Sequence, residues 1–168
     1  MTTIFTEKKE NSIKLKKELG LLLKYKPLWL IKITDNSLLN ELIEWFKELP
    51  IWFIIFSESV NTEILSKNIA ITSKLDNNML SWFDFIVCDN EIELLDLYLK
   101  NWVTPIINKN NYLSSILKEF DPLKNDWNTF FYDNMNKYSI FYSIIRYIEN
   151  YKFPFDNKNL VKNVLKIN

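Results

Sequence analysis

The chain has 168 residues, a length that predicts a single domain covering residues 1–168, and its 48% hydrophobic and 25% charged residues exclude disorder throughout. Twenty-one basic residues balance twenty-one acidic ones, which argues against nucleic acid or a membrane surface as a partner. With no histidine, one glycine (Gly20) and one arginine (Arg146), the sequence excludes a Ser–His–Asp site, a glycine-rich phosphate loop and a paired arginine clamp.

Six stretches rich in β-branched and aromatic residues predict strands. They are PLWLIKI from Pro27, PIWFIIF from Pro50, NIAITS from Asn68, FDFIVCD from Phe83, TPII from Thr104 and TFFY from Thr129. Several of these stretches are continuous apolar runs rather than alternating ones. That pattern is typical of strands that are covered on both faces in a parallel sheet.

Helical patterns lie before and between these strands. KKENSIKLKKELGLLL predicts a helix that ends near Gly20, and its mixed charges from Glu7 to Glu18 indicate a solvated face. SLLNELIEWF predicts a helix with Ser37 as its N-cap, EIELLDLYL predicts another from Glu91, and an apolar stripe predicts one around residues 141–148. The alternation predicts an α/β, Rossmann-like fold with a mainly parallel sheet of about six strands and helices on both faces.

The carboxyl ends of the strands are where an open α/β sheet binds ligands, so polar residues there are candidates. Lys32 ends the first strand, and Glu91 and Glu93 follow the strand that Asp89 ends. A simpler interpretation is that the acidic residues favour the first turn of the next helix and that the lysine is solvated. Cys88 is interpreted as a small core residue, and a single cysteine is typical of a reducing, cytoplasmic location.

Aromatic residues also recur toward the C-terminus. The tyrosines and phenylalanine of this group are interpreted as helix packing rather than as a platform for a sugar. They are Tyr138, Phe141, Tyr142 and Tyr147.

The segment PIINKNNYLSSILKEFDP, residues 105–122, resembles the stretch P-I-V-R-x-T-G-G-L-x-D-T-V-x-D-x-D-P of bacterial glycogen synthases and plant starch synthases. KKELGLLLKYKPLWLIKITDNSLL resembles an earlier stretch of the same family, and FDFIVCD is similar to its A-D-I-F-L-x-P-S. NTFFYDN, followed by the helix that carries Arg146, resembles G-F-x-F … A-I-x-R-A-L. The resemblance covers the chain from about Leu15 to Leu165.

This resemblance implies the C-terminal half of a two-domain GT-B glycosyltransferase, which holds the donor ADP-glucose or UDP-glucose. We expect no N-terminal acceptor domain in this chain. Lys32 stands near one of the two cations that neutralise the family's donor diphosphate, and the other cation has no counterpart. Glu91 or Glu93 matches a family glutamate, and the family's T-G-G is replaced by residues with bulkier side chains. These residues are Asn110, Asn111 and Tyr112.

Because these departures remove groups that would stabilise a leaving diphosphate, we expect a degenerate, non-catalytic domain. The candidate nucleotide-sugar residues are then vestigial, no residue is assigned a catalytic role, and no metal or other cofactor is expected. Such a pseudo-glycosyltransferase would bind a partner protein, or weakly a glucan or an ADP- or UDP-sugar. Two alternatives are the donor-binding half of a split glucan synthase, which is active only with a separate partner half, and a plain nucleotide-binding module.

Three tryptophans lie where the family has glycines, at positions whose turns would favour a positive φ. They are Trp82, Trp102 and Trp127. One hypothesis is that some of them are UGA codons that the source reads as glycine. The alternative is that they are genuine tryptophans that fill the space of a shortened site.

Overall fold

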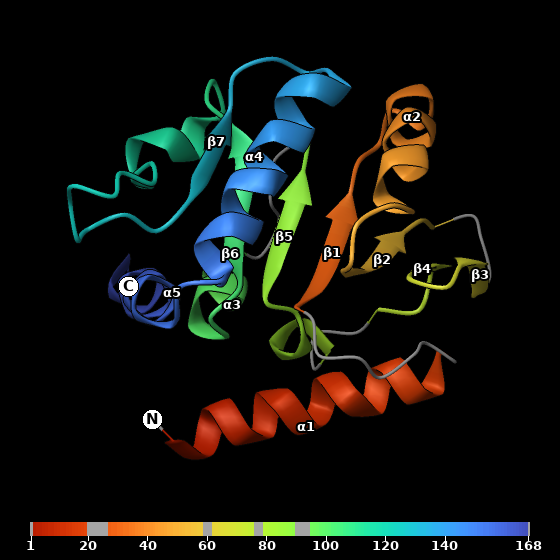
Figure 1. The fold of residues 1–168 in the computed structure, drawn as a ribbon, viewed down its shortest axis with the longest axis horizontal. Coiled ribbons are helices and arrows are strands. Elements are labelled where there is room, and N and C mark those ends of the chain that lie inside the picture. The colour runs from red at the N-terminus through yellow and green to blue at the C-terminus, as the bar shows by residue number, and fades with distance from the viewer. Residues whose placement is uncertain (1, 20–26, 59–61, 76–78, 90–94, 168) are drawn as a thin grey trace.

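A computed structural model describes residues 2–19, 27–58, 62–75, 79–89 and 95–167. Seven strands form one sheet (Figure 1). They are β1 (Leu28–Lys32), β2 (Trp52–Phe56), β3 (Glu63–Ser66), β4 (Ile69–Thr72), β5 (Phe85–Cys88), β6 (Thr104–Asn108) and β7 (Phe130–Tyr132). The helices are α1 (Thr2–Glu18), α2 (Asn36–Phe46), α3 (Leu95–Lys100), α4 (Lys137–Tyr151) and α5 (Pro154–Val164), with short 3-10 helices at Met79–Trp82, Tyr112–Ser115 and Leu165–Ile167.

The strand order is β3-β4-β2-β1-β5-β6-β7, and every neighbouring pair is parallel except β3 and β4. Without β3 this is the order of a doubly wound, Rossmann-like sheet, whose switch point lies between β1 and β5. The chain moves to one side of β1 through α2 and to the other side of β5 through α3. Right-handed crossovers therefore place α2 and α3 on opposite faces of the sheet.

The predicted fold class and all six predicted strands are confirmed, and the sheet has one strand in addition to these six. The additional strand, β3, forms a hairpin with β4 at the edge of the sheet, and its residues are exposed or half-buried. The sequence EILS therefore carries none of the continuous apolar signal of the central strands. In β1, by contrast, the four residues Leu28–Ile31 have no exposed surface, because helices cover both faces of the sheet.

Helix α2 begins two residues earlier than an N-cap at Ser37 predicts. Its N-cap is Asp35, not Ser37, because the Asp35 carboxylate accepts hydrogen bonds from the backbone N–H groups of Ser37 and Leu38. Helix α5 was not predicted, and it begins at Pro154 in a largely polar segment. Helix α1 ends at Glu18, close to the predicted end near Gly20, and the predicted start of a helix at Glu91 lies outside the described residues.

Helix α1 runs beneath the amino-terminal ends of β1 and β5 (Figure 1). The sequence indicated a solvated charged face on this helix, and that prediction is only partly correct. Lys16 is buried, and the Lys8 ammonium donates to the carbonyls of Asn101 and Trp102. Burial lowers the pKa of Lys8 to about 8, although Asp84 opposes this effect. The helix is therefore fixed to the turn after α3 by a partly desolvated lysine.

That turn has an unusual backbone. Trp102 has a φ of 61°, and within the described ranges it is the one residue other than glycine with a positive φ. The prediction of a glycine-like turn is thus correct at Trp102 and wrong at Trp82 and Trp127. Trp82 lies in a 3-10 helix, and the Trp127 ring is buried against Phe120.

Candidate functional site

The switch point of the sheet is occupied by a carboxylate of the chain itself. Lys32, the last residue of β1, is paired in register with Cys88, the last residue of β5, so that Asp89 extends beyond the end of β5. Asp89 Oδ2 lies 2.6 Å from the Thr34 backbone nitrogen, 2.8 Å from the Thr34 hydroxyl oxygen and 3.3 Å from the Asp35 nitrogen. All three groups donate to this oxygen, so the loop after β1 is hydrogen-bonded to the Asp89 carboxylate.

The backbone N–H groups at the start of α2 are likewise bound by a carboxylate. Asp35 Oδ1 lies 2.9 Å from the nitrogen of Ser37 and 3.1 Å from that of Leu38. In doubly wound folds, the N–H groups of this loop and helix start are the ones that bind a phosphate. Here Asp35 and Asp89 occupy several of those groups, and their negative charges would repel an incoming diphosphate.

Lys32 is at the carboxyl edge of the sheet, as predicted, and its side chain is half-buried. Its ammonium lies 5.5 Å from the centre of the Phe56 ring, which attracts the cation. Glu91 and Glu93 lie outside the described residues, so their predicted place in this crevice is not tested.

The loop after β6 brings Asn110, Asn111 and Tyr112 to the same edge, two strands away from Lys32. Its N–H groups are also bound by neighbouring side chains: Asn108 Oδ1 accepts from the Asn110 nitrogen at 2.9 Å, and Asn111 Oδ1 accepts from the Leu113 nitrogen at 3.0 Å. Tyr112 is 59% exposed. This loop therefore consists of two Asx turns followed by an exposed ring.

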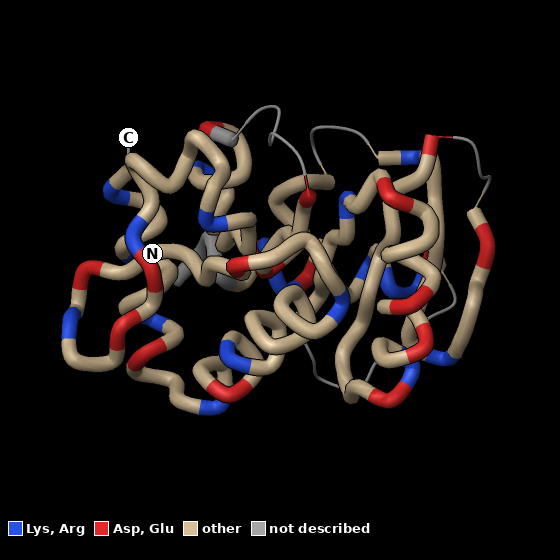
Figure 2. The backbone as a smooth tube through the Cα atoms, turned by 90° about the horizontal axis from the view of Figure 1, so that it is seen from above, with Lys and Arg blue, Asp and Glu red and all other residues tan. Residues whose placement is uncertain are grey.

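Side chains also bind the backbone N–H groups at the start of α4, on the same edge of the sheet. Ser139 Oγ accepts from the nitrogens of Asp133 and Asn134, and Asn136 Oδ1 accepts from the Ser139 nitrogen. Figure 2 shows the backbone from this side, with the positions of Lys and Arg interspersed among those of Asp and Glu. The described part of this edge therefore lacks the concentrated positive charge that a diphosphate site uses.

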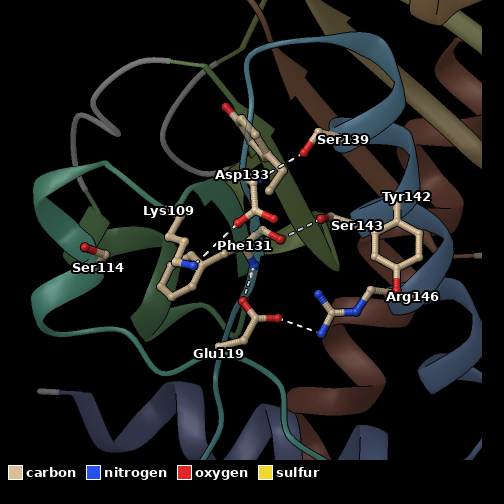
Figure 3. A pocket seen from close by; sticks show the side chains of 10 residues that line it. Lys109, Ser114, Glu119, Phe131, Asp133, Ser139, Tyr142, Ser143 and Arg146 are labelled. Carbon is tan, nitrogen blue, oxygen red and sulfur yellow. Dashed lines mark hydrogen bonds and ion pairs between the residues drawn. The ribbon is translucent and has the colours of Figure 1, made fainter.

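A second feature lies between β7 and α4, where side chains surround a hollow of about 600 Å³ (Figure 3). At its base, Glu119 Oε2 accepts from the Phe131 nitrogen at 2.6 Å, and Glu119 Oε1 forms an ion pair with Arg146 Nη2 at 2.7 Å. Burial raises the pKa of the Glu119 carboxyl, while the Phe131 N–H and Arg146 oppose the rise. Sequence reasoning missed Glu119, and only the isolated arginine signalled this place.

The aromatic residues of α4 divide between the core and the surface. Tyr147 is buried and Phe141 is half-buried, as expected for helix packing. Tyr138 and Tyr142 are 68% and 64% exposed. The Tyr138 ring still packs edge-on against Trp45 of α2, with 5.5 Å between the ring centres, so the interpretation as packing is confirmed for Tyr138 and does not hold for Tyr142. Tyr142 lines the hollow and Tyr138 does not.

Two further properties of the described residues bear on the class of site. Their cysteine, aspartate and glutamate side chains form no group of three or more that could hold a metal ion. None of their helices has both the length and the apolar character needed to cross a bilayer.

No protein-family model matches the sequence, and no curated protein matches it. Among solved structures, the chain is similar to the catalytic domain of starch synthase IV from Arabidopsis thaliana, a structure with ADP and acarbose bound. The TM-score is 0.75 at 18% identity, and the match covers 96% of this chain and 39% of that chain. At this identity the likeness shows the fold. The chain thus has the fold of a GT-B half-domain, and the resemblance to the C-terminal donor half is confirmed at that level.

Proposed function

We propose that this chain is a non-catalytic, pseudo-glycosyltransferase domain that acts as a binding or partner module. The observation that carries this proposal is the Asp89 carboxylate bound to Thr34 at the switch point of the sheet. A donor diphosphate at this point would have to displace Asp89 and would face the charge of Asp35 as well. The carboxylates instead serve the fold, because they accept hydrogen bonds from the backbone N–H groups of Thr34, Asp35, Ser37 and Leu38.

The proposal also follows from what glycosyl transfer demands. Transfer from a nucleotide sugar requires stabilisation of the negative charge that develops on the leaving diphosphate. Lys32 is a single ammonium beside Phe56 and cannot replace a pair of cations together with free backbone N–H groups. Loss of that stabilisation leaves a fold that can bind but has no means to accelerate transfer.

A second candidate is the donor-binding half of a split glucan synthase. It is favoured by one observation: the chain spans 39% of the length of the starch synthase chain that it matches. In that case a separate polypeptide would supply the remaining part, and the two halves would form the cleft together.

A transfer assay distinguishes the two candidates. The purified chain is incubated with glycogen and ADP-glucose or UDP-glucose labelled in the glucose, and the catalytic domain of the Arabidopsis enzyme serves as the positive control. The proposal predicts no label in glycogen above a blank without protein. Label incorporated by the chain alone would overturn it, and label that appears only after a second polypeptide is added would establish the split enzyme.

A further inference from the structure

The outer face of α2 and α4 carries a row of aromatic rings. The two helices lie side by side on one face of the sheet (Figure 1), and the Trp45 ring of α2 joins them, with its centre 5.5 Å from that of Tyr138 and 4.8 Å from that of Phe141. Trp45 is half-buried, while Tyr138 and Tyr142, one turn apart on α4, are exposed. Tryptophan and tyrosine are the residues that most often form the centre of a protein–protein contact.

Helix α2 presents negative charge beside these rings. Three carboxylates recur at intervals of three and four residues, which places them along one exposed stripe of the helix and the turn that follows it. They are Glu41, Glu44 and Glu48. The same segment, residues 36–48, has one cation, Lys47. The α2 half of the face is therefore acidic.

Helix α4 has the opposite balance. Residues 137–152 hold three cations and one carboxylate, Glu149. The cations are Lys137, Arg146 and Lys152. Two of them lie beside the exposed rings, because the Lys137 ammonium is 5.4 Å from the centre of the Tyr138 ring and the Arg146 guanidinium is 5.7 Å from that of Tyr142. The α4 half of the face is therefore basic.

A face with one acidic and one basic half is complementary to itself. The chain already pairs the two halves internally, because the Lys137 ammonium lies 2.9 Å from the Glu41 carboxylate. A two-fold axis that runs along the helices and between them sets α2 of each copy on α4 of the other, so that opposite charges meet twice. The net charge of zero leaves no overall repulsion between two copies, whereas a strongly acidic or basic partner would be repelled by one of the helices.

We infer that the α2–α4 face binds the same face of a second copy of this chain. The rings of Trp45, Tyr138 and Tyr142 form the centre of the contact, and the charges of α2 lie against those of α4. This inference goes beyond the proposed function, because the contact involves neither the switch point nor a donor. A transfer assay and a measurement of mass therefore test the two proposals separately.

The first test is sedimentation velocity of the purified chain at concentrations from about 1 μM to 1 mM. We expect the weight-average mass to rise from that of one chain to that of two, with a dissociation constant in roughly the micromolar range. A mass that stays at one chain throughout would overturn the inference. A mass that rises past two chains would also overturn it, because an isologous contact closes at the dimer.

A pair of alanine variants locates the contact. Tyr142→Ala removes an exposed ring from the centre of the face and is expected to raise the dissociation constant of the dimer at least about tenfold. Phe155→Ala removes an equally exposed ring from α5, outside the face, and is expected to leave the dissociation constant unchanged. Equal effects of the two variants would show that the copies do not meet through α2 and α4.

A charge exchange tests which helix faces which. Glu44→Lys on α2 and Lys152→Glu at the end of α4 change exposed residues, and each variant alone is expected to dimerise more weakly because like charges then meet. In an equimolar mixture, each altered helix of one variant can face the oppositely altered helix of the other, so association is expected to return. Circular dichroism confirms that both variants fold. A mixture that associates no better than either variant alone would overturn the inference.

Discussion

The carboxylate of Asp89 is bound to both the backbone N–H and the hydroxyl of Thr34, at 2.6 and 2.8 Å. This contact joins the ends of β1 and β5, the two strands on either side of the switch point. The same oxygen atom therefore ties the centre of the sheet together and occupies the place where a Rossmann-like fold would bind phosphate.

Replacement of Asp89 by alanine is expected to lower the free energy of unfolding by about 1–3 kcal/mol, because hydrogen bonds to a charged acceptor are lost. Urea denaturation followed by circular dichroism measures the change. Asp96→Ala, at an exposed aspartate of α3, is the matched control and is expected to change stability by less than about 1 kcal/mol. Equal losses in both variants would show that the Asp89–Thr34 contact does not stabilise the fold.

At Trp102 the backbone predicts an order of stability between two variants. Both Trp102→Ala and Trp102→Gly lose a buried indole, but at a φ of 61° alanine is about 1 kcal/mol less favourable than glycine. Trp102→Gly is therefore expected to be the more stable of the two in urea denaturation.

Trp127 provides the control, because it is buried but does not have a positive φ. There, Trp127→Ala is expected to be more stable than Trp127→Gly by about 0.4–1 kcal/mol, since glycine gives the unfolded chain more freedom. The same order at both positions would contradict the geometry of the turn at Trp102.

The buried ammonium of Lys8 makes stability depend on pH. Its pKa is lowered from 10.5 to about 8 in the folded protein, so between these values the unfolded chain holds more protons on this side chain than the folded chain. The contribution of Lys8 to the free energy of unfolding therefore rises with pH between about pH 8 and 10.5, and it is constant below that range. Denaturation at pH 7, 8 and 9 tests this directly.

The comparison with Lys8→Met isolates this contribution. Burial also raises the pKa of the Cys88 thiol, and this lowers the free energy of unfolding as the pH rises above about 9. The effect of Cys88 is the same in the original chain and in Lys8→Met, so it cancels in the comparison. We expect the stability of the original chain relative to Lys8→Met to increase from pH 7 to pH 9. Relative to Lys9→Met, at an exposed lysine, it is expected to stay constant. A difference from Lys8→Met that is independent of pH would contradict the burial of the ammonium.

The sequence predicts those parts of the fold that depend on local pattern. The central strands are continuous apolar runs, so the local sequence pattern is enough to locate them. The carboxyl ends of these strands place Lys32 and the loop of Asn110 at one edge of the sheet. The edge strand β3 was missed because EILS is short and has no continuous apolar run, and the helix α5 was missed because six of its eleven residues are polar. The choice of Asp35 over Ser37 as N-cap moves the start of the helix by two residues, and local pattern does not fix a helix start that closely.

The chemistry of the candidate site depends on contacts between distant segments. Asp89 ends a strand in the sequence, but its partner Thr34 follows a different strand, so the closure of the switch point follows only from the order of strands. Glu119 and Arg146 likewise meet across β7 and α4. No spacing rule joins such pairs, which is why the sequence indicated a degenerate site without showing what occupies it.

The most direct test of the proposed closure of the sheet edge is calorimetric titration of the chain with ADP, alongside Lys32→Ala. We expect either no measurable heat or a dissociation constant no lower than roughly millimolar. Any binding that remains is expected to be lost in Lys32→Ala, because Lys32 is the cation matched to this place. A dissociation constant for ADP below about 1 μM, or binding that is the same in Lys32→Ala, would show that Asp89 does not close this edge of the sheet to a nucleotide.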